Sequence, residues 1–170
     1  MKKAGIIALI ILAFFIIYFL QADFFSWFNL FVILILFVGL FAGKKIGLIL
    51  GLIFGILIDL LIGKSIGISG ILLGAIGLIA EYCDKNFSKD SKLTIILMVI
   101  ISTFIYEVGI YAFTIIKGGI EIELWSFSKI MLIEMLYNSL LIIILYPLIH
   151  KLGYAMENVF KSKTIMTRYF

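Results

Sequence analysis

Six long apolar segments follow one another along the chain, and short stretches with charged residues separate them. The segments cover residues 4–20, 24–42, 46–62, 66–80, 93–116 and 130–149. A bilayer core needs about 20 consecutive apolar residues in a helix, with a range of roughly 17–25. We therefore predict an all-α polytopic membrane protein whose residues 1–150 form a bundle of six transmembrane helices. Residues 151–170 are predicted to form a short cytoplasmic tail.

The first and last apolar segments allow two finer predictions. Lys2 and Lys3 precede the first segment as they would in a signal peptide, but its apolar run exceeds the usual length of about 7–15 residues. Since no typical cleavage site follows, we predict an uncleaved helix. Pro147 stands near the end of the sixth segment and is expected to kink or end that helix.

Composition supports a membrane environment. Hydrophobic residues make up 64% of the 170 residues and charged residues 14%, and the mean hydropathy is +1.26. A soluble domain typically has about 45–50% apolar and about 25% charged residues. A soluble globular enzyme, a secreted disulfide scaffold and a disordered tail are therefore excluded. The single Cys83 and the single His150 predict neither an internal disulfide nor a metal centre with imidazole and thiolate ligands.

The 14 Lys and Arg residues are unevenly distributed between the loops, and the net charge is +4. With the N-terminus in the cytoplasm, eleven of them fall in inside segments and only Lys64, Lys117 and Lys129 fall outside. Positive charge accumulates on the cytoplasmic side of membrane proteins. We therefore predict that both termini are cytoplasmic, and that the basic excess reflects topology rather than nucleic-acid binding.

Glycines recur at helical spacing in the third and fourth segments, and a carboxylate takes one position of the series. The candidate positions are Gly47, Gly51, Gly55, Asp59, Gly63, Gly67, Gly70 and Gly74. Glycine lets a neighbouring helix backbone approach closely, and such packing replaces the hydrophobic driving force within lipid. The pattern predicts either helix packing inside the bundle or a thin surface that another protein contacts.

Acidic residues inside the apolar segments are the candidate chemistry of this chain, because charged side chains are expensive in a bilayer. Asp23, Asp59, Glu107 and Glu134 all fall in the predicted outer half of the bundle. Tyr137 and Asn138 follow Glu134 by three and four residues, so they share its helix face. The predicted outer-half polar cluster comprises Asp59, Glu107, Glu134, Tyr137 and Asn138.

Two interpretations of this cluster stay open. In the first, the carboxylates form a site for a cation, a substrate amine or a basic residue of a partner. Alternatively, they pair within the bundle with Lys64, Lys117 and Lys129, or with tyrosine hydroxyls and asparagine amides.

The segment from Gly51 to Gly67, GLIFGILIDLLIGKSIG, resembles the G-x-x-x-G-x-x-x-D-x-x-x-G signature of the bacterial rod shape-determining protein MreD family. Residues 138–148 resemble the last-helix pattern of the same family. By this resemblance, Gly51, Gly55, Asp59, Gly63 and Gly67 are interface or structural residues.

The resemblance implies a non-enzymatic component of the cell-elongation machinery in the bacterial cytoplasmic membrane. Such a component binds the single-span protein MreC and helps to link MreB filaments, directly or indirectly, to the peptidoglycan synthases. The family fold is similar to the S components of energy-coupling-factor transporters. No catalytic, cofactor-binding or metal-binding residue carries over.

Two other classes of function compete with this one. An S-component-like subunit that binds a small molecule predicts a closed outer cavity, lined by the acidic residues together with Tyr106, Tyr111 and Asn138. A membrane-embedded enzyme would need a nucleophile–base pair or a set of metal ligands. Because the spacing of the polar residues does not require either, we predict no enzymatic activity.

Overall fold

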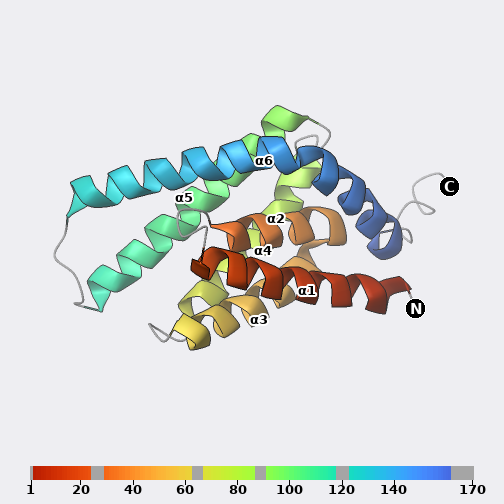
Figure 1. Cartoon of the computed structure of the whole chain (residues 1–170), viewed down its shortest axis with the longest axis horizontal. Coiled ribbons are helices and arrows are strands. Elements are labelled where there is room, and N and C mark those ends of the chain that lie inside the picture. Colours follow the sequence, from red (N-terminus) through yellow and green to blue (C-terminus); the bar gives the residue numbers. More distant parts are fainter. Residues whose placement is uncertain (1, 24–28, 63–66, 87–90, 118–122, 162–170) are drawn as a thin grey trace.

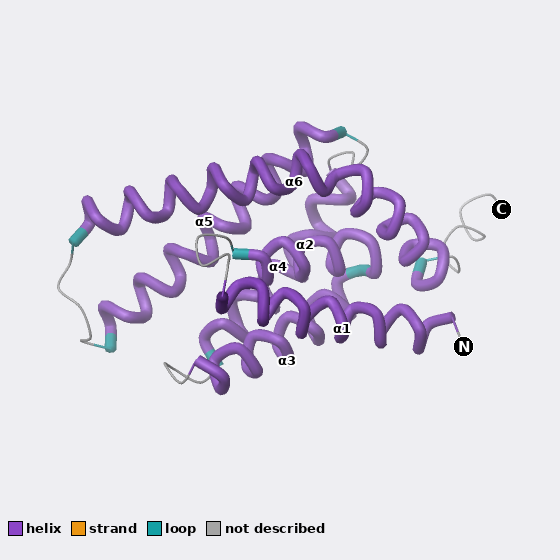
Figure 2. Tube along the Cα trace, in the orientation of Figure 1, coloured by secondary structure: helices purple, strands orange, loops and turns teal. Residues whose placement is uncertain are grey.

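The computed structural model describes residues 2–23, 29–62, 67–86, 91–117 and 123–161 of the chain. These residues form helices joined by short connections, and no strand occurs among them (Figure 2). The helices are α1 (Lys2–Asp23), α2 (Leu30–Ala42), α3 (Lys44–Ile62), α4 (Ile68–Asn86), α5 (Lys92–Ile116) and α6 (Leu124–Phe160). The predicted all-α class is therefore confirmed.

Three stretches of the described chain are long and apolar enough to cross a membrane. They are Lys3–Gln21, Lys92–Ile116 and Leu124–Phe160. Leu30–Ala42 and Ile68–Cys83 are shorter apolar helices. The number of six crossings therefore stays a prediction, as does the cytoplasmic placement of the termini.

The short helix α2 lies at the centre of the fold and contacts every other helix. Eleven of its 13 residues are buried, as expected for a helix that is apolar on all sides. The side chain of Asn29 caps its first turn by accepting the backbone N–H of Val32 at 3.4 Å. Gly43 ends it with φ = +99°, a conformation that glycine adopts without steric cost.

Two antiparallel helix pairs pack around α2. The first pair, α3 and α4, packs against α2, whereas α5 and α6 extend beyond it (Figure 1). Helix α1 packs against α2 and α6 at the edge of the molecule. The start of α1 meets the end of α6, since Lys3 Nζ lies 5.9 Å from the ring centroid of Phe160.

Helix α6 is longer than the segment predicted from the apolar pattern. It begins at Leu124 and ends at Phe160, so it includes the first ten residues of the predicted tail. Pro147 lies inside it, and Figure 1 shows the helix changing direction between its light-blue and dark-blue parts. Proline therefore bends this helix without ending it, as one of the two predicted outcomes.

Candidate functional site

The predicted glycines of the third and fourth segments lie at the contact between α3 and α4. A Cβ atom added at Gly51 would lie 2.6 Å from the carbonyl oxygen of Leu73, and one at Gly47 would lie 2.9 Å from that of Gly77. Real Cβ atoms essentially never come within 3.0 Å of a heavy atom outside their own and the neighbouring residues. The backbones of the two helices therefore touch at positions where only glycine fits.

A third helix joins this contact through a glycine that the sequence analysis did not single out. A Cβ atom added at Gly39 of α2 would lie 2.5 Å from the carbonyl oxygen of Gly77. One added at Gly47 would lie 2.7 Å from the Cα of Gly39. Three helices thus cross where Gly39, Gly47 and Gly77 meet. A signal was present, since Gly39 and Gly43 continue the four-residue spacing of Gly47, Gly51 and Gly55 toward the N-terminus.

Gly70 and Gly74 lie on the same side of α4 but are packed less tightly. A Cβ atom at Gly70 would lie 3.0 Å from Cγ1 of Ile56, and one at Gly74 would lie 3.1 Å from Cγ of Leu52. The neighbours of Gly74 are side-chain atoms, which can shift more easily than a backbone, whereas a Cβ atom at Gly70 would also meet the carbonyl oxygen of Leu52 at 3.1 Å. A Cβ atom added at Gly55 would lie 2.4 Å from the Cα of Gly70, so the two backbones touch there as well. Gly67 has φ = +100° and open space at its Cβ position, so it serves the turn. Gly63 lies outside the described residues.

Asp59 holds the start of α4. Its carboxylate oxygen Oδ2 accepts the backbone N–H of Gly67 at 2.8 Å and that of Ser69 at 3.1 Å. The side chain is buried, with 7% of its surface exposed. A carboxylate at a helix N-terminus satisfies unpaired N–H groups and balances the positive end of the helix dipole. Asp59 therefore fastens the last turn of α3 to the first turn of α4.

Glu81 does the same at the opposite end of the pair. This residue of α4 accepts the backbone N–H of Lys44, the first residue of α3. Each helix of the antiparallel pair thus supplies a carboxylate to the N-terminus of the other. In the sequence, Glu81 follows Gly77 by four residues as Asp59 follows Gly55, but the reciprocal capping depends on how the two helices are paired.

A second polar group connects α2, α5 and α6. Asn138 is fully buried; its Oδ1 accepts the backbone N–H of Asn29 at 3.1 Å, and its Nδ2 donates to Thr103 Oγ1 at 3.0 Å. Asn29 Nδ2 donates to Glu107 Oε1 at 3.2 Å. Hydrogen bonds of this kind hold transmembrane helices together. Asn29 and Thr103 were not predicted as site residues; the only signal for Asn29 is its place before an apolar run, where a helix cap is expected.

Tyr106 lies between the two polar groups. Its hydroxyl donates to Ser69 Oγ at 3.2 Å, and it is within electrostatic reach of Asp59, Glu107 and Glu134. The carboxyl groups of Glu107 and Glu134 lie close enough to interact. Asp59, Glu107, Glu134 and Asn138 of the predicted outer-half polar cluster are therefore neighbours in space.

The remaining predicted polar residues differ in their surroundings. Tyr137 is 42% exposed, whereas the next residue, Asn138, is fully buried. The hydroxyl of Tyr111 and the Oε2 atom of Glu134 are buried and have no hydrogen-bond partner among the described residues. The side chain of Asp23 lies outside the described residues. The described part of the chain contains no group of three or more His, Cys, Asp or Glu residues that could hold a metal ion.

The contacts of the cluster support internal pairing, which is one of the two interpretations that the sequence left open. Asp59 and Glu107 accept hydrogen bonds from groups of this chain. The amide partner of Glu107 is an asparagine, as one form of that interpretation expects, and it comes from α2. The apolar groove between α1, α2 and α6 is lined by none of the cluster residues.

A family model described as rod shape-determining protein MreD matches residues 3–155. The matched range begins in α1 and ends in α6, and it includes both polar groups and all of the tight glycine contacts. No curated protein and no solved structure matches the chain.

Proposed function

The chain belongs to the MreD family of rod shape-determining proteins, and from that premise we propose that it is a non-enzymatic membrane scaffold of the cell-elongation machinery. The family match carries the general role, which is the determination of rod shape. Our finer proposal is that the chain binds an MreC-like single-span protein in the bacterial cytoplasmic membrane. Through it, the scaffold helps to link MreB filaments, directly or indirectly, to peptidoglycan synthesis.

The surface of the molecule supports a scaffold that binds helices within the bilayer. In the most apolar stretch of α1 only 11% is buried inside the chain, and the same share is buried in that of α6. Along α6, exposed apolar side chains recur at helical spacing, among them Leu136 with 66% exposure and Ile144 with 72%. A single-span partner can pack on such a surface through van der Waals contacts, which drive helix association in lipid.

The contacts inside the molecule support the proposal that the scaffold is rigid. The two carboxylate caps and the glycine contacts fix α3 against α4, and the Asn29–Asn138–Thr103 hydrogen bonds fix α2 against α5 and α6. We propose that the polar groups stabilise the bundle in which they lie, and that the partner contacts its lipid-facing side.

We also propose six crossings with both termini in the cytoplasm. An even number of crossings returns the chain to the side on which it began, and the contact between Lys3 and Phe160 agrees with that arrangement. In a Cys83→Ser background, a membrane-impermeant maleimide added to intact cells should label Lys117→Cys and leave Lys45→Cys unlabelled until the membrane is opened. The reverse pattern would overturn the orientation.

The binding proposal is tested by site-specific photo-crosslinking in native membranes, followed by mass spectrometry of the products. A photoreactive residue replaces Leu12, Ile71, Leu97 or Ile144, one exposed position on each of four helices, and the buried Ile35 serves as the control. We expect an MreC-like single-span protein to be captured from at least one exposed position and not from Ile35. Capture of an ATP-binding-cassette module with its coupling subunit, or of no single-span protein from any position, would overturn the proposal.

A further inference from the structure

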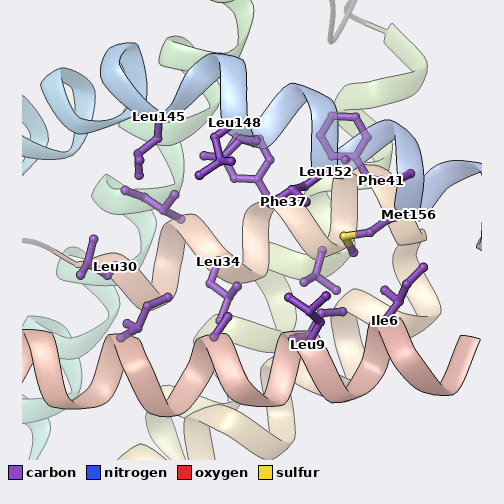
Figure 3. A pocket seen from close by; sticks show the side chains of 18 of the residues that line it. Ile6, Leu9, Leu30, Leu34, Phe37, Phe41, Leu145, Leu148, Leu152 and Met156 are labelled. Carbon is purple, nitrogen blue, oxygen red and sulfur yellow. The ribbon is translucent and has the colours of Figure 1, made fainter.

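An apolar groove of about 520 Å³ lies between α1, α2 and α6. Helix α2 forms its floor, and α1 and α6 form its two walls (Figure 3). Ile6 of α1 lies near Met156 of α6 at one end of the groove, and Phe37 of α2 lies between the walls that carry Leu9 and Leu148 (Figure 3). Every side chain that lines the groove is apolar.

The contents of the groove are constrained by the chemistry of its walls. A water molecule needs roughly two to four polar partners in a buried site, and apolar walls supply none. The groove differs in this respect from the contact between α3 and α4, where backbones touch directly. In a bilayer, such a space is filled by hydrocarbon, from lipid or from a helix of another protein.

The size of the groove distinguishes these two occupants. An apolar cavity of about 150 Å³ holds one benzene ring, so on the same scale this groove holds on the order of twenty carbon atoms. Along its α1 wall, from Ile6 to Leu20, the groove extends about 21 Å at a rise of 1.5 Å per residue. A helix of that length, about 10–12 Å across, would occupy roughly 1,600–2,400 Å³.

A single acyl chain fits both dimensions. A fully extended chain advances about 1.2 Å per bond, so one of about 16–18 carbons reaches about 20 Å. Its carbon count is also close to the capacity of the groove. A transmembrane helix would fit only if α1 moved away from α6.

One end of the groove carries positive charge. Lys3 precedes Ile6 by three residues on α1, so the two share a helix face. The Lys3 ammonium lies over the ring of Phe160, which follows the lining residue Met156 by four residues. Nearby, the ammonium of Lys161 lies 3.9 Å from the carboxylate of Glu157. The exposed Lys3 is therefore a basic group that a headgroup can reach at this end.

We propose that this groove is a binding site for one acyl chain of an anionic phospholipid, whose phosphate lies beside Lys3. The chain fills the space between α1 and α6 and thereby holds α1 against the bundle. This site does not rest on the proposed scaffold function and exists in the chain without any partner.

The test uses the full chain, purified and reconstituted into vesicles of equal parts phosphatidylcholine and phosphatidylglycerol. A trace of phosphatidylglycerol with a diazirine in one acyl chain is photolysed, and the labelled residues are mapped by mass spectrometry. We expect labels to concentrate on groove residues such as Leu34 and Leu145. Unlabelled phosphatidylglycerol should compete better than phosphatidylcholine.

Two pairs of variants make the test specific. Ala13→Phe fills the groove and should lower groove labelling about ten-fold, whereas Ala112→Phe, at an exposed position of α5, should leave it unchanged. Lys3→Gln should lower the preference for phosphatidylglycerol about five-fold, whereas Lys45→Gln at an exposed position of α3 should not. Thermal unfolding checks that each variant is folded, and the lysine pair decides the outcome if Ala13→Phe does not fold.

Three results would overturn the proposal. Labelling that spreads evenly over all exposed apolar faces would show ordinary contact with the bilayer. If Lys3→Gln did not change the preference of groove labelling for phosphatidylglycerol, the proposed contact between Lys3 and an anionic headgroup would be wrong. A crosslink from a photoreactive residue at Leu34 to a partner helix or to a second copy of this chain would identify a protein occupant.

Discussion

The α3–α4 pair and the α1–α6 pair show two opposite ways to pack helices in a membrane. Between α3 and α4 the backbones touch, and a Cβ atom at Gly51 would lie 2.6 Å from a carbonyl oxygen. Between α1 and α6 the helices leave a groove of about 520 Å³ lined by leucine, isoleucine and other apolar residues. Small side chains permit direct contact, whereas large ones hold the helices apart.

The difference also separates rigid from adaptable parts of the molecule. Reciprocal carboxylate caps from Asp59 and Glu81 fix the register of α3 against α4. Helix α1 has little of its surface buried, and it meets the bundle at Phe14, whose ring stacks on Phe54 of α3 with 4.3 Å between the centroids. The first pair is therefore fixed by direct backbone contact and capping, and the second leaves a surface that lipid or a partner can cover.

The largest expected effect comes from enlarging a glycine in the tight pair. Gly51→Leu places a side chain against the backbone of Leu73, so the helices must separate. We expect a loss of about 2–3 kcal/mol of stability, and a fall in unfolding midpoint of roughly 5–10 °C in detergent. Gly5→Leu is the matched control, because nothing lies within 4 Å of its Cβ position. Equal midpoints for the two variants would contradict the tight contact.

Removing the cap at the start of α4 should have the next largest effect. Asp59→Ala leaves the N–H groups of Gly67 and Ser69 without their acceptor, and we expect a cost of about 1–2 kcal/mol. Asp59→Asn keeps an acceptor oxygen, so its cost in stability should be smaller than that of Asp59→Ala. Any loss of partner binding in Asp59→Asn should be no larger than its loss of stability explains. Thermal unfolding of both variants, with partner co-purification alongside, measures this. The capping role is wrong if Asn and Ala are equally destabilising.

The polar link between α5 and α6 should contribute a smaller amount. Replacing Asn138 by Leu removes the bonds to Thr103 and Asn29, and interhelical hydrogen bonds in membranes contribute about 0.6 kcal/mol on average, up to about 1.7. A double-mutant cycle with Thr103→Val isolates the side-chain pair. A coupling energy indistinguishable from zero would show that this bond does not stabilise the bundle.

The smallest effect on stability is expected in the groove. Ala13→Phe adds a ring where the structure has space, so the unfolding free energy in detergent should change by less than about 0.5 kcal/mol. A destabilisation as large as that of Gly51→Leu would remove the distinction between the two helix pairs.

Much of the fold could be predicted from local pattern, and part of the site could not. Asp59 and the glycines were visible because their spacing repeats within α3 and again within α4. The network of Asn29, Thr103 and Asn138 was only partly visible, because Asn29 and Asn138 are 109 residues apart in sequence. A sequence shows that a polar residue lies in an apolar helix, but its partner depends on which helices are neighbours.

The sequence by itself determined the helical class, the membrane character and the family, because these follow from composition, from periodicity along single helices and from a motif of fixed spacing. The tertiary structure decided which carboxylate caps which helix, where Gly39 meets Gly47 and Gly77, and where the groove lies. The physical reason is that close backbone approach, capping across helices and unfilled space are properties of pairs and triplets of helices. Their relative placement is set by packing of the whole bundle.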